Sequence, residues 1–457
     1  MSLADAGQVC CAHLLPGITI TPETVKKLFS ILLASLAVGV GAQEQENWNA
    51  HGQATYGWQT KPAFRAPYQG PNSLNAAQER SYSLTATAAL GLRVGPHTEV
   101  YLDAEAAQGV PLSGLVGLSG FQNGELAKTS GANITAYRAR SFLQHTIELG
   151  GGPVTLESAA NQLAGTTASR RVVITAGTIS VLDIFDAGGI AHDPRTQFMN
   201  WALMTHSAYD YPADSRGYTT GLVVEYMDDG WAVRAGRLQV PRQPNQLSLD
   251  PRMSRHYGDQ LEFTRDYKTG MQSGIARLLA FHTHTVLARY ADALVESKAS
   301  GATPDINQVR TGEHGKWGLG LGVDHKLRDD VSLFARAMYA DGKTETDAFT
   351  EADRSLSAGV AVRGARWTRP DDTFGLAAAF AFLSRVHREY LVRAGTTFFL
   401  GDGALNYRPE RVFEAYYSFA VARGTYATLD VQRITNPGYN ADRGPVSIYG
   451  VRLHWER

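Results

Sequence analysis

Arginines and carboxylates stand at alternating positions in several short segments of this chain. Arg138, Arg140 and Glu148 lie in one of them, YRARSFLQHTIE. Planar guanidinium groups and carboxylates can form paired hydrogen bonds to adjacent hydroxyls of a solute. The alternative for each single charge is a solvated wall residue. The candidate binding residues combine these charges with one aromatic side chain: Asp103, Glu105, Arg138, Arg140, Glu148, Trp201, Arg234, Glu262, Arg336, Arg363 and Glu414.

Catalytic and metal-binding patterns are weak elsewhere in the chain. The sequence has no G-x-S-x-G nucleophile motif and no convincing set of serine, histidine and acid, so we expect no enzyme. His282 and His284 lack a third ligand, which favours two ordinary polar positions over a zinc site. GLGLGVD (318–324) resembles a phosphate-binding loop only by its glycine count, and inside a strand its glycines would admit neighbouring bulk. We expect neither a metal nor a cofactor.

Strands with one apolar and one polar face would position the candidate residues. In WNAHGQATYGW (48–58) the even positions are apolar, aromatic or small, and four of the odd positions are polar. This period of two predicts a β-strand. Trp48 and Trp58 bracket the apolar face, about 34 Å apart along the strand and about 25 Å apart in height after a typical tilt. The spacing matches a lipid-facing strand with aromatics at both membrane interfaces.

The same pattern recurs along the chain. Short turns and long connections alternate, and the long connections include 108–134, 182–217 and 384–409. This alternation is typical of an outer-membrane barrel. We predict an all-β fold, a transmembrane antiparallel β-barrel of 16 strands with 18 as the alternative count, short periplasmic turns and long extracellular loops. The alternative is a soluble β-sandwich or propeller. The expected strands are 48–58, 80–94, 98–107, 135–148, 170–181, 218–228, 230–239, 257–267, 272–283, 315–325, 330–340, 353–363, 372–383, 410–421, 425–433 and 446–456.

The connection 182–217 is too apolar and aromatic for an ordinary surface loop. It could fold inward and narrow a pore, where Trp201, Tyr209, Tyr211 and Phe198 would stack on a sugar ring. Arg195, Asn200 and Asp193 would then bond its hydroxyls. The alternative is a plug that contacts no solute. Both interpretations fit the sequence.

The chain begins with a pattern of export. Lys26 and Lys27 precede an apolar run and the small residues Val40-Gly41-Ala42, which is the layout of a signal peptide. We expect residues 1–42 to be removed, with an over-long start, and residues 43–457 to form one barrel domain. A short buried helix is the alternative. Both cysteines, Cys10 and Cys11, would leave with the signal, so disulfides are not expected.

The formal net charge is −1, which argues against nucleic acid as a partner.

Several blocks of the sequence resemble the carbohydrate-selective porins of Gram-negative outer membranes. They include HGQATYGWQTKPAFRAPYQGPNSL, AHDPRTQFMNWALM and NPGYNADRGPVSIYGVRLHWE, and they cover nearly the whole predicted mature chain. The resemblance implies a 16-stranded barrel that passes monosaccharides and small polyols through a lumen lined with arginines, carboxylates and aromatics. One departure is that Trp455 is followed by Glu456 and Arg457, where such barrels usually end in an aromatic residue.

We therefore expect a multi-pass outer-membrane protein that lets neutral sugars diffuse passively and saturably. Its expected partners are glucose-like monosaccharides, outer-membrane lipid and the outer-membrane assembly machinery, and the expected state is a monomer or a homotrimer. The main alternative is a general or anion-preferring porin without a sugar site. A barrel enzyme such as a membrane lipase, and an adhesive barrel with a plugged lumen, are further alternatives.

Overall fold

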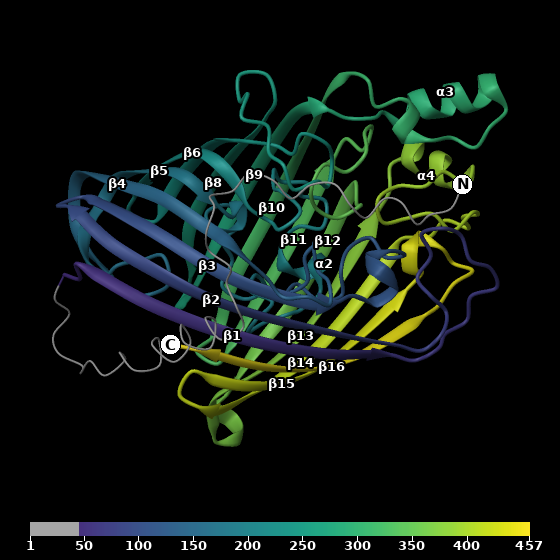
Figure 1. Ribbon diagram of the computed structural model, residues 1–457. Helices are drawn as coiled ribbons and strands as arrows, with labels where there is room; N and C mark the ends of the chain where they lie inside the picture. Colours follow the sequence, from purple (N-terminus) through teal and green to yellow (C-terminus); the bar gives the residue numbers. More distant parts are fainter. Residues whose placement is uncertain (1–44) are drawn as a thin grey trace. The chain divides into compact units, whose positions relative to one another are not determined.

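Antiparallel strands close into a 16-stranded barrel, in which β1 pairs with both β2 and β16 (Figure 1). The computed structural model describes residues 45–457. The predicted signal peptide and both cysteines lie outside the described residues. The strands are β1 (Trp48–Lys61), β2 (Glu79–Gly95), β3 (Thr98–Val110), β4 (Thr135–Leu156), β5 (Gly165–Ile179), β6 (Thr219–Asp228), β7 (Trp231–Leu238), β8 (Tyr257–Thr269), β9 (Gln272–Val286), β10 (Glu313–Arg328), β11 (Val331–Ala340), β12 (Arg354–Gly364), β13 (Arg369–Phe382), β14 (Glu410–Ala422), β15 (Thr425–Thr435) and β16 (Val446–Glu456).

The predicted class and strand count are confirmed, and each predicted strand has its counterpart in the barrel. The largest difference lies at the hairpin of β4 and β5. There β4 continues past the predicted end at residue 148, with register shifts on both sides of Gly150. Gly150 has a φ of 98°, a conformation that glycine adopts readily, so the strand bends and continues.

Short and long connections alternate around the barrel. Most of the short ones are tight turns, such as Asp229-Gly230 and Gly270-Met271, and they gather at what we call the turn end. The long ones gather at the opposite end, the loop end, where helices α3 (Tyr290–Ser300) and α4 (Arg385–Val392) lie (Figure 1). The remaining helical segments are η1 (Leu112–Leu115), η2 (Val181–Asp183), α2 (Trp201–Met204), η3 (Ile306–Gln308), η4 (Ala365–Trp367) and η5 (Pro437–Tyr439).

The two faces of the wall differ as the alternation predicts. Large apolar side chains such as Leu102, Leu321 and Leu453 are exposed on the outside. In β1, Thr55 and Gln59 are fully buried on the inside, whereas Trp48 is 66% exposed. The outer face of the wall is thus apolar, as lipid contact requires.

No helix within residues 45–457 is long and apolar enough to cross a membrane.

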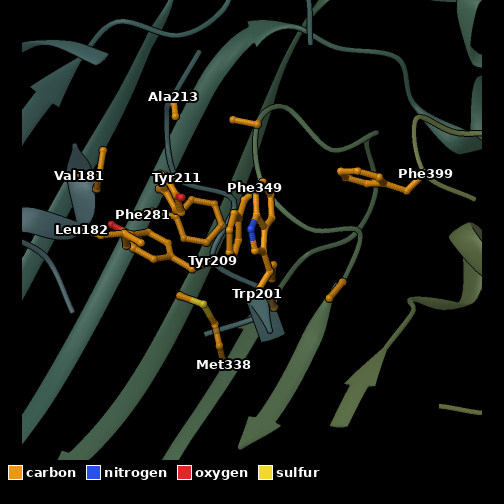
Figure 2. Packing of buried hydrophobic residues seen from close by; sticks show 14 of the residues in the cluster. Val181, Leu182, Trp201, Tyr209, Tyr211, Ala213, Phe281, Met338, Phe349 and Phe399 are labelled. Carbon is orange, nitrogen blue, oxygen red and sulfur yellow. The ribbon is translucent and has the colours of Figure 1, made fainter. Parts of the chain in front are cut away.

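The hydrophobic core lies inside the lumen, between the wall and the loops that enter it. Trp201 stacks on Phe349 with ring centroids 4.9 Å apart and an interplanar angle of 13°. Tyr211 packs against Phe349 and Tyr209 against Phe281 of the wall (Figure 2). Aromatic groups from distant segments therefore fill much of the barrel interior, which fixes the loops as a rigid insert.

Candidate functional site

The connection from β5 to β6, residues 180–218, folds into the lumen, and we call it the constriction loop. Its helix α2 (Trp201–Met204) is capped by Asn200, whose side chain accepts a hydrogen bond from the backbone N–H of Ala202. The Glu414 carboxylate on the wall accepts the backbone N–H groups of Met199 and Asn200, the latter at 3.0 Å. The start of α2 is thereby held against the wall.

Arg336, on β11 of the wall, holds the constriction loop at two further points. Arg336 donates to the carbonyl oxygens of Ala191 and Leu203 at 2.8 and 3.1 Å. Its guanidinium also pairs with Asp186 at 3.0 Å. Arg336 and Glu414 are 5% and 1% exposed, because the loop covers them. The structure corrects their predicted place: they face inward, but they hold the loop and do not line an open pore.

The wall on the side of β3 and β4 carries charges that line a cavity. Asp103 and Arg140 pair across these strands at 3.2 Å. Arg140 also forms a two-point pair with Asp183 of the constriction loop, with both N–O distances at 2.7 Å. One guanidinium therefore joins the wall to the loop through two carboxylates.

Arg138 lies on the other face of β4, so its prediction as a pore-lining residue is wrong. It is exposed and stands opposite Ala104, whereas Arg140 stands opposite Asp103. The register shifts by one residue between these two pairs, leaving Ala139 as an extra residue. A bulge of this kind places positions two apart on opposite faces, which strict alternation does not anticipate.

A second arginine, from the loop itself, faces the same space. Arg195 donates from Nη2 to Glu105 at 3.0 Å and from Nε to Glu125 at 3.1 Å. Glu105 also accepts the hydroxyls of Tyr137, at 2.5 Å, and Tyr218, at 3.2 Å. These bonds leave Nη1 of Arg195 without a partner in the described part of the chain, so it can donate to a solute.

Two cavities meet at these arginines. The entry cavity, toward the loop end, has a volume of about 140 Å³ and is lined by residues such as Glu105, Tyr137 and Tyr218. The exit cavity, toward the turn end, has about 610 Å³. Both cavities share one set of lining residues, which we call the constriction: Gly124, Glu125, Arg140, Ser180, Leu182, Arg195 and Met204. A solute that moves between the cavities must pass Arg140 and Arg195.

Trp201 belongs both to the lining of the entry cavity and to the aromatic core. It lines the entry cavity, yet it is 9% exposed and most of its ring packs on Phe349 and Phe121. Tyr209 and Phe198, which the sequence also offered for sugar stacking, are fully buried. Most aromatic residues of the loop thus form its packing core, and Trp201, Tyr211 and Tyr218 also reach the entry cavity.

The remaining predicted residues lie on the inner wall but away from the constriction. Arg234 pairs with Glu262 at 3.1 Å in a recess near the turn end. Arg363 lines a wide vestibule at the turn end, with a volume of about 1020 Å³. Glu148 is exposed and accepts the backbone N–H of Ala168. The structure therefore brings together Asp103, Glu105 and Arg140, with Trp201 beside them.

Residues 341–353, which connect β11 to β12, also hold the constriction loop. Asp210 accepts Nζ of Lys316 at 2.7 Å and the consecutive backbone N–H groups of residues 347–349 at 2.8–2.9 Å. Burial raises the pKa of Asp210, but Lys316 and these donors outweigh burial and bring it below its ordinary value. Asp210 stays ionised at neutral pH and ties residues 341–353 to the constriction loop.

Glu125 was missing from the predicted set because it lies in a loop. Periodicity assigns faces only within strands, so it says nothing of loop side chains. The aromatic content of 182–217 did indicate an inserted loop, and Arg195 was named there. Asp183 was missed, although it lies in the same segment. Among residues 45–457, no cluster of three or more His, Cys, Asp or Glu could hold a metal ion, and His282 and His284 lie beside Tyr257.

A closed transmembrane barrel with a charged constriction and cavities on both sides defines a porin-type channel. A family model described as carbohydrate-selective porin, OprB family, matches residues 71–456. The chain belongs to this family of carbohydrate-selective porins. It is thus a Gram-negative outer-membrane porin and not an enzyme, so that the loop end is extracellular and the turn end periplasmic.

Comparison with solved structures finds similarity to other outer-membrane channels. The high-pH structure of Pseudomonas putida OprB is 15% identical, with a TM-score of 0.67 over 90% of this chain and 94% of that one. The channel DcaP of Acinetobacter baumannii is 10% identical, with a TM-score of 0.48 over 92% and 100% of the two chains. OccAB1 of the same species is 11% identical, with a TM-score of 0.48 over 91% and 98%. A comparison with curated protein sequences finds no match.

Proposed function

We propose that this porin passes neutral monosaccharides and related small polyols by passive, saturable diffusion, with weak binding at the constriction. The observation that carries the proposal is that Arg140 and Arg195 line both cavities. Each is oriented by carboxylates, so its planar donors are fixed toward a passing solute. A fixed guanidinium beside a carboxylate offers both donors and acceptors to the adjacent hydroxyls of a sugar. Weak binding of this kind favours entry without blocking exit.

The balance of charge at the constriction favours a neutral solute over an anion. Arg140 is paired with Asp103 and Asp183, and Arg195 with Glu105 and Glu125. Each positive group therefore faces two negative ones, which leaves no excess positive charge to attract anions. A general or anion-preferring porin without a sugar site remains the alternative that the experiment must separate. We also expect outer-membrane lipid around the barrel, folding by the assembly machinery, and a monomeric or homotrimeric state.

Single-channel conductance in a planar bilayer tests the proposal. Refolded protein would be titrated with glucose, other monosaccharides and a disaccharide. We expect the current to fall saturably with a monosaccharide, because a bound sugar occupies the constriction and excludes ions. A current that no sugar changes would overturn the sugar site and leave a general porin. A reversal potential that shows preference for anions would instead support the anion-preferring alternative.

A further inference from the structure

The connection from β4 to β5, residues 157–164, belongs topologically to the periplasmic turns, yet it folds into the lumen. Asn49 of β1 donates to Ser158 Oγ at 3.1 Å and to the carbonyl oxygen of Gln162 at 2.9 Å. The backbone N–H of Leu163 donates to the Tyr101 hydroxyl at 3.0 Å. These contacts with the inner wall fix the segment inside the barrel, and we call it the periplasmic finger.

The tip of the periplasmic finger reaches the constriction. Asn161 has a φ of 63°, a conformation that asparagine tolerates better than most residues, and this projects its side chain from the turn. Its Nδ2 donates to Asp103 Oδ2 at 3.0 Å, the same oxygen that accepts from Arg140 at 3.2 Å. Asp103 is therefore shared between the finger and a constriction arginine.

The finger also forms one wall of the exit cavity. Residues 158–161 line this cavity together with Asp103, Arg140 and Arg195. Asp103 is 1% exposed, and its Oδ1 has no hydrogen-bond partner in residues 45–457; the same holds for Oδ1 of Asn161. A buried acceptor without a donor is unfavourable, and hydroxyl groups of a solute can supply the donor after a small side-chain rotation. The exit cavity thus has acceptors on the finger and donors on the arginines.

We propose that the exit cavity is a second sugar subsite, completed by Asn161 of the periplasmic finger. A neutral monosaccharide would pass from the entry cavity to this subsite while still bonded to Arg140 or Arg195, which line both cavities. Two weak adjoining sites allow fast transfer because neither holds the solute tightly. This inference rests on the proposed function and adds a residue and a position to it.

A polyol fits the exit cavity better than a metal ion does. No group of three or more His, Cys, Asp or Glu within residues 45–457 could hold a metal. The guanidinium of Arg140 lies 3.2 Å from Asp103 and repels a cation there. The unpaired acceptors instead suit hydroxyl donors, which carry no net charge.

The experiment compares sugar block from each side of single channels that have inserted in a known orientation. The test variant is Asn161→Gly, which keeps the φ of 63° accessible and removes the amide. The matched control is Gln162→Ala, a neighbour that does not line the cavity. We expect Asn161→Gly to lower the rate of glucose block from the periplasmic side about fivefold, as loss of one hydrogen bond predicts, and to leave block from the extracellular side within about twofold.

Each outcome decides between two positions of the binding site. Equal block rates for Asn161→Gly and wild type on both sides would overturn the exit subsite and leave the proposed function intact. A parallel loss on both sides would show that the finger only supports the constriction, which also overturns the subsite. Wild-type channels that glucose blocks from neither side would overturn the proposed function as well.

Discussion

At the scale of single residues, Arg140 acts through its geometry as well as through its charge. Its three nitrogens contact two carboxylates, Asp103 and Asp183. Lysine carries the same charge on a single point and cannot form this fork. We expect Arg140→Lys to raise the half-blocking concentration of glucose about tenfold, a change of ~1.4 kcal/mol, with little change in ion selectivity. Sugar titration of single-channel current and the reversal potential measure the two quantities.

Arg138→Lys is the matched control for that prediction, because Arg138 lies two positions away on the outer face of β4. It should leave the half-blocking concentration unchanged. If both substitutions raise the half-blocking concentration equally, the effect of Arg140→Lys comes from a change in β4 and not from lost contacts with the solute.

Lys128 is a cavity-lining lysine whose charge changes close to neutral pH. It lines the entry cavity and donates to Asn245 at 2.6 Å. Burial lowers the pKa of Lys128 to about 8, although Asp210 and Asp347 oppose that shift. A lysine is charged below its pKa and neutral above it, so a rise from pH 7 to pH 9 removes most of one positive charge from the cavity. We expect the cation-to-anion permeability ratio to rise about twofold over this range, as measured by reversal potentials in a salt gradient.

The comparison that tests Lys128 is the methionine variant. Lys128→Met should have the high ratio at both pH values and no change between them. A pH dependence equal to that of wild type would assign the titration to another group.

At the scale of elements, the constriction loop depends on the wall residues that hold it. Glu414 accepts two backbone N–H groups from the loop, and each such bond is worth about 1 kcal/mol. We expect Glu414→Leu to release the start of α2, to increase open-channel conductance and its noise, and to admit larger polyethylene glycols. Single-channel recording with polyethylene glycols of graded size measures the cut-off.

Two further variants test whether the change in Glu414→Leu comes from the loss of its hydrogen bonds to the loop. Glu414→Gln keeps one acceptor oxygen and should lie between wild type and Glu414→Leu. Glu148→Leu removes an exposed carboxylate far from the loop and should leave the size cut-off unchanged. An unchanged cut-off in Glu414→Leu would show that the remaining contacts, such as those of Arg336, hold the loop alone.

The strands were predictable from the sequence because each face meets a different solvent, and the side-chain period of two follows directly. Gly320 illustrates a correct inference of the same kind, since an added Cβ would lie 3.1–3.2 Å from Met338 and His206. The bulge at Ala139 was not predictable, since a single extra residue leaves no mark in the pattern. Contacts such as Arg195 with Glu105 join a loop to a wall, and no local periodicity encodes them.

At the scale of the whole molecule, the wall and the inserted loop have separate tasks. The wall closes through a continuous ladder of backbone hydrogen bonds from β1 to β16, which needs no loop. The inserted loops supply the constriction and most of the aromatic core, including Trp201, Tyr209 and Phe349. The order of the strands therefore followed from their sequence alone, whereas the interior depends on packing between distant segments.

This division predicts the behaviour of a barrel without its constriction. We expect replacement of residues 186–206 by a Gly/Ser segment of equal length to leave a folded β-barrel with several-fold higher conductance and no block by glucose. Its thermal midpoint should fall, because the aromatic packing around Trp201 and Phe198 is lost. Circular dichroism, thermal unfolding and single-channel recording measure these effects. The control replaces residues 294–300 of the exposed helix α3, which lines neither cavity, and should change none of the channel properties. Persistent glucose block in the loop variant would place the sugar site on the wall itself.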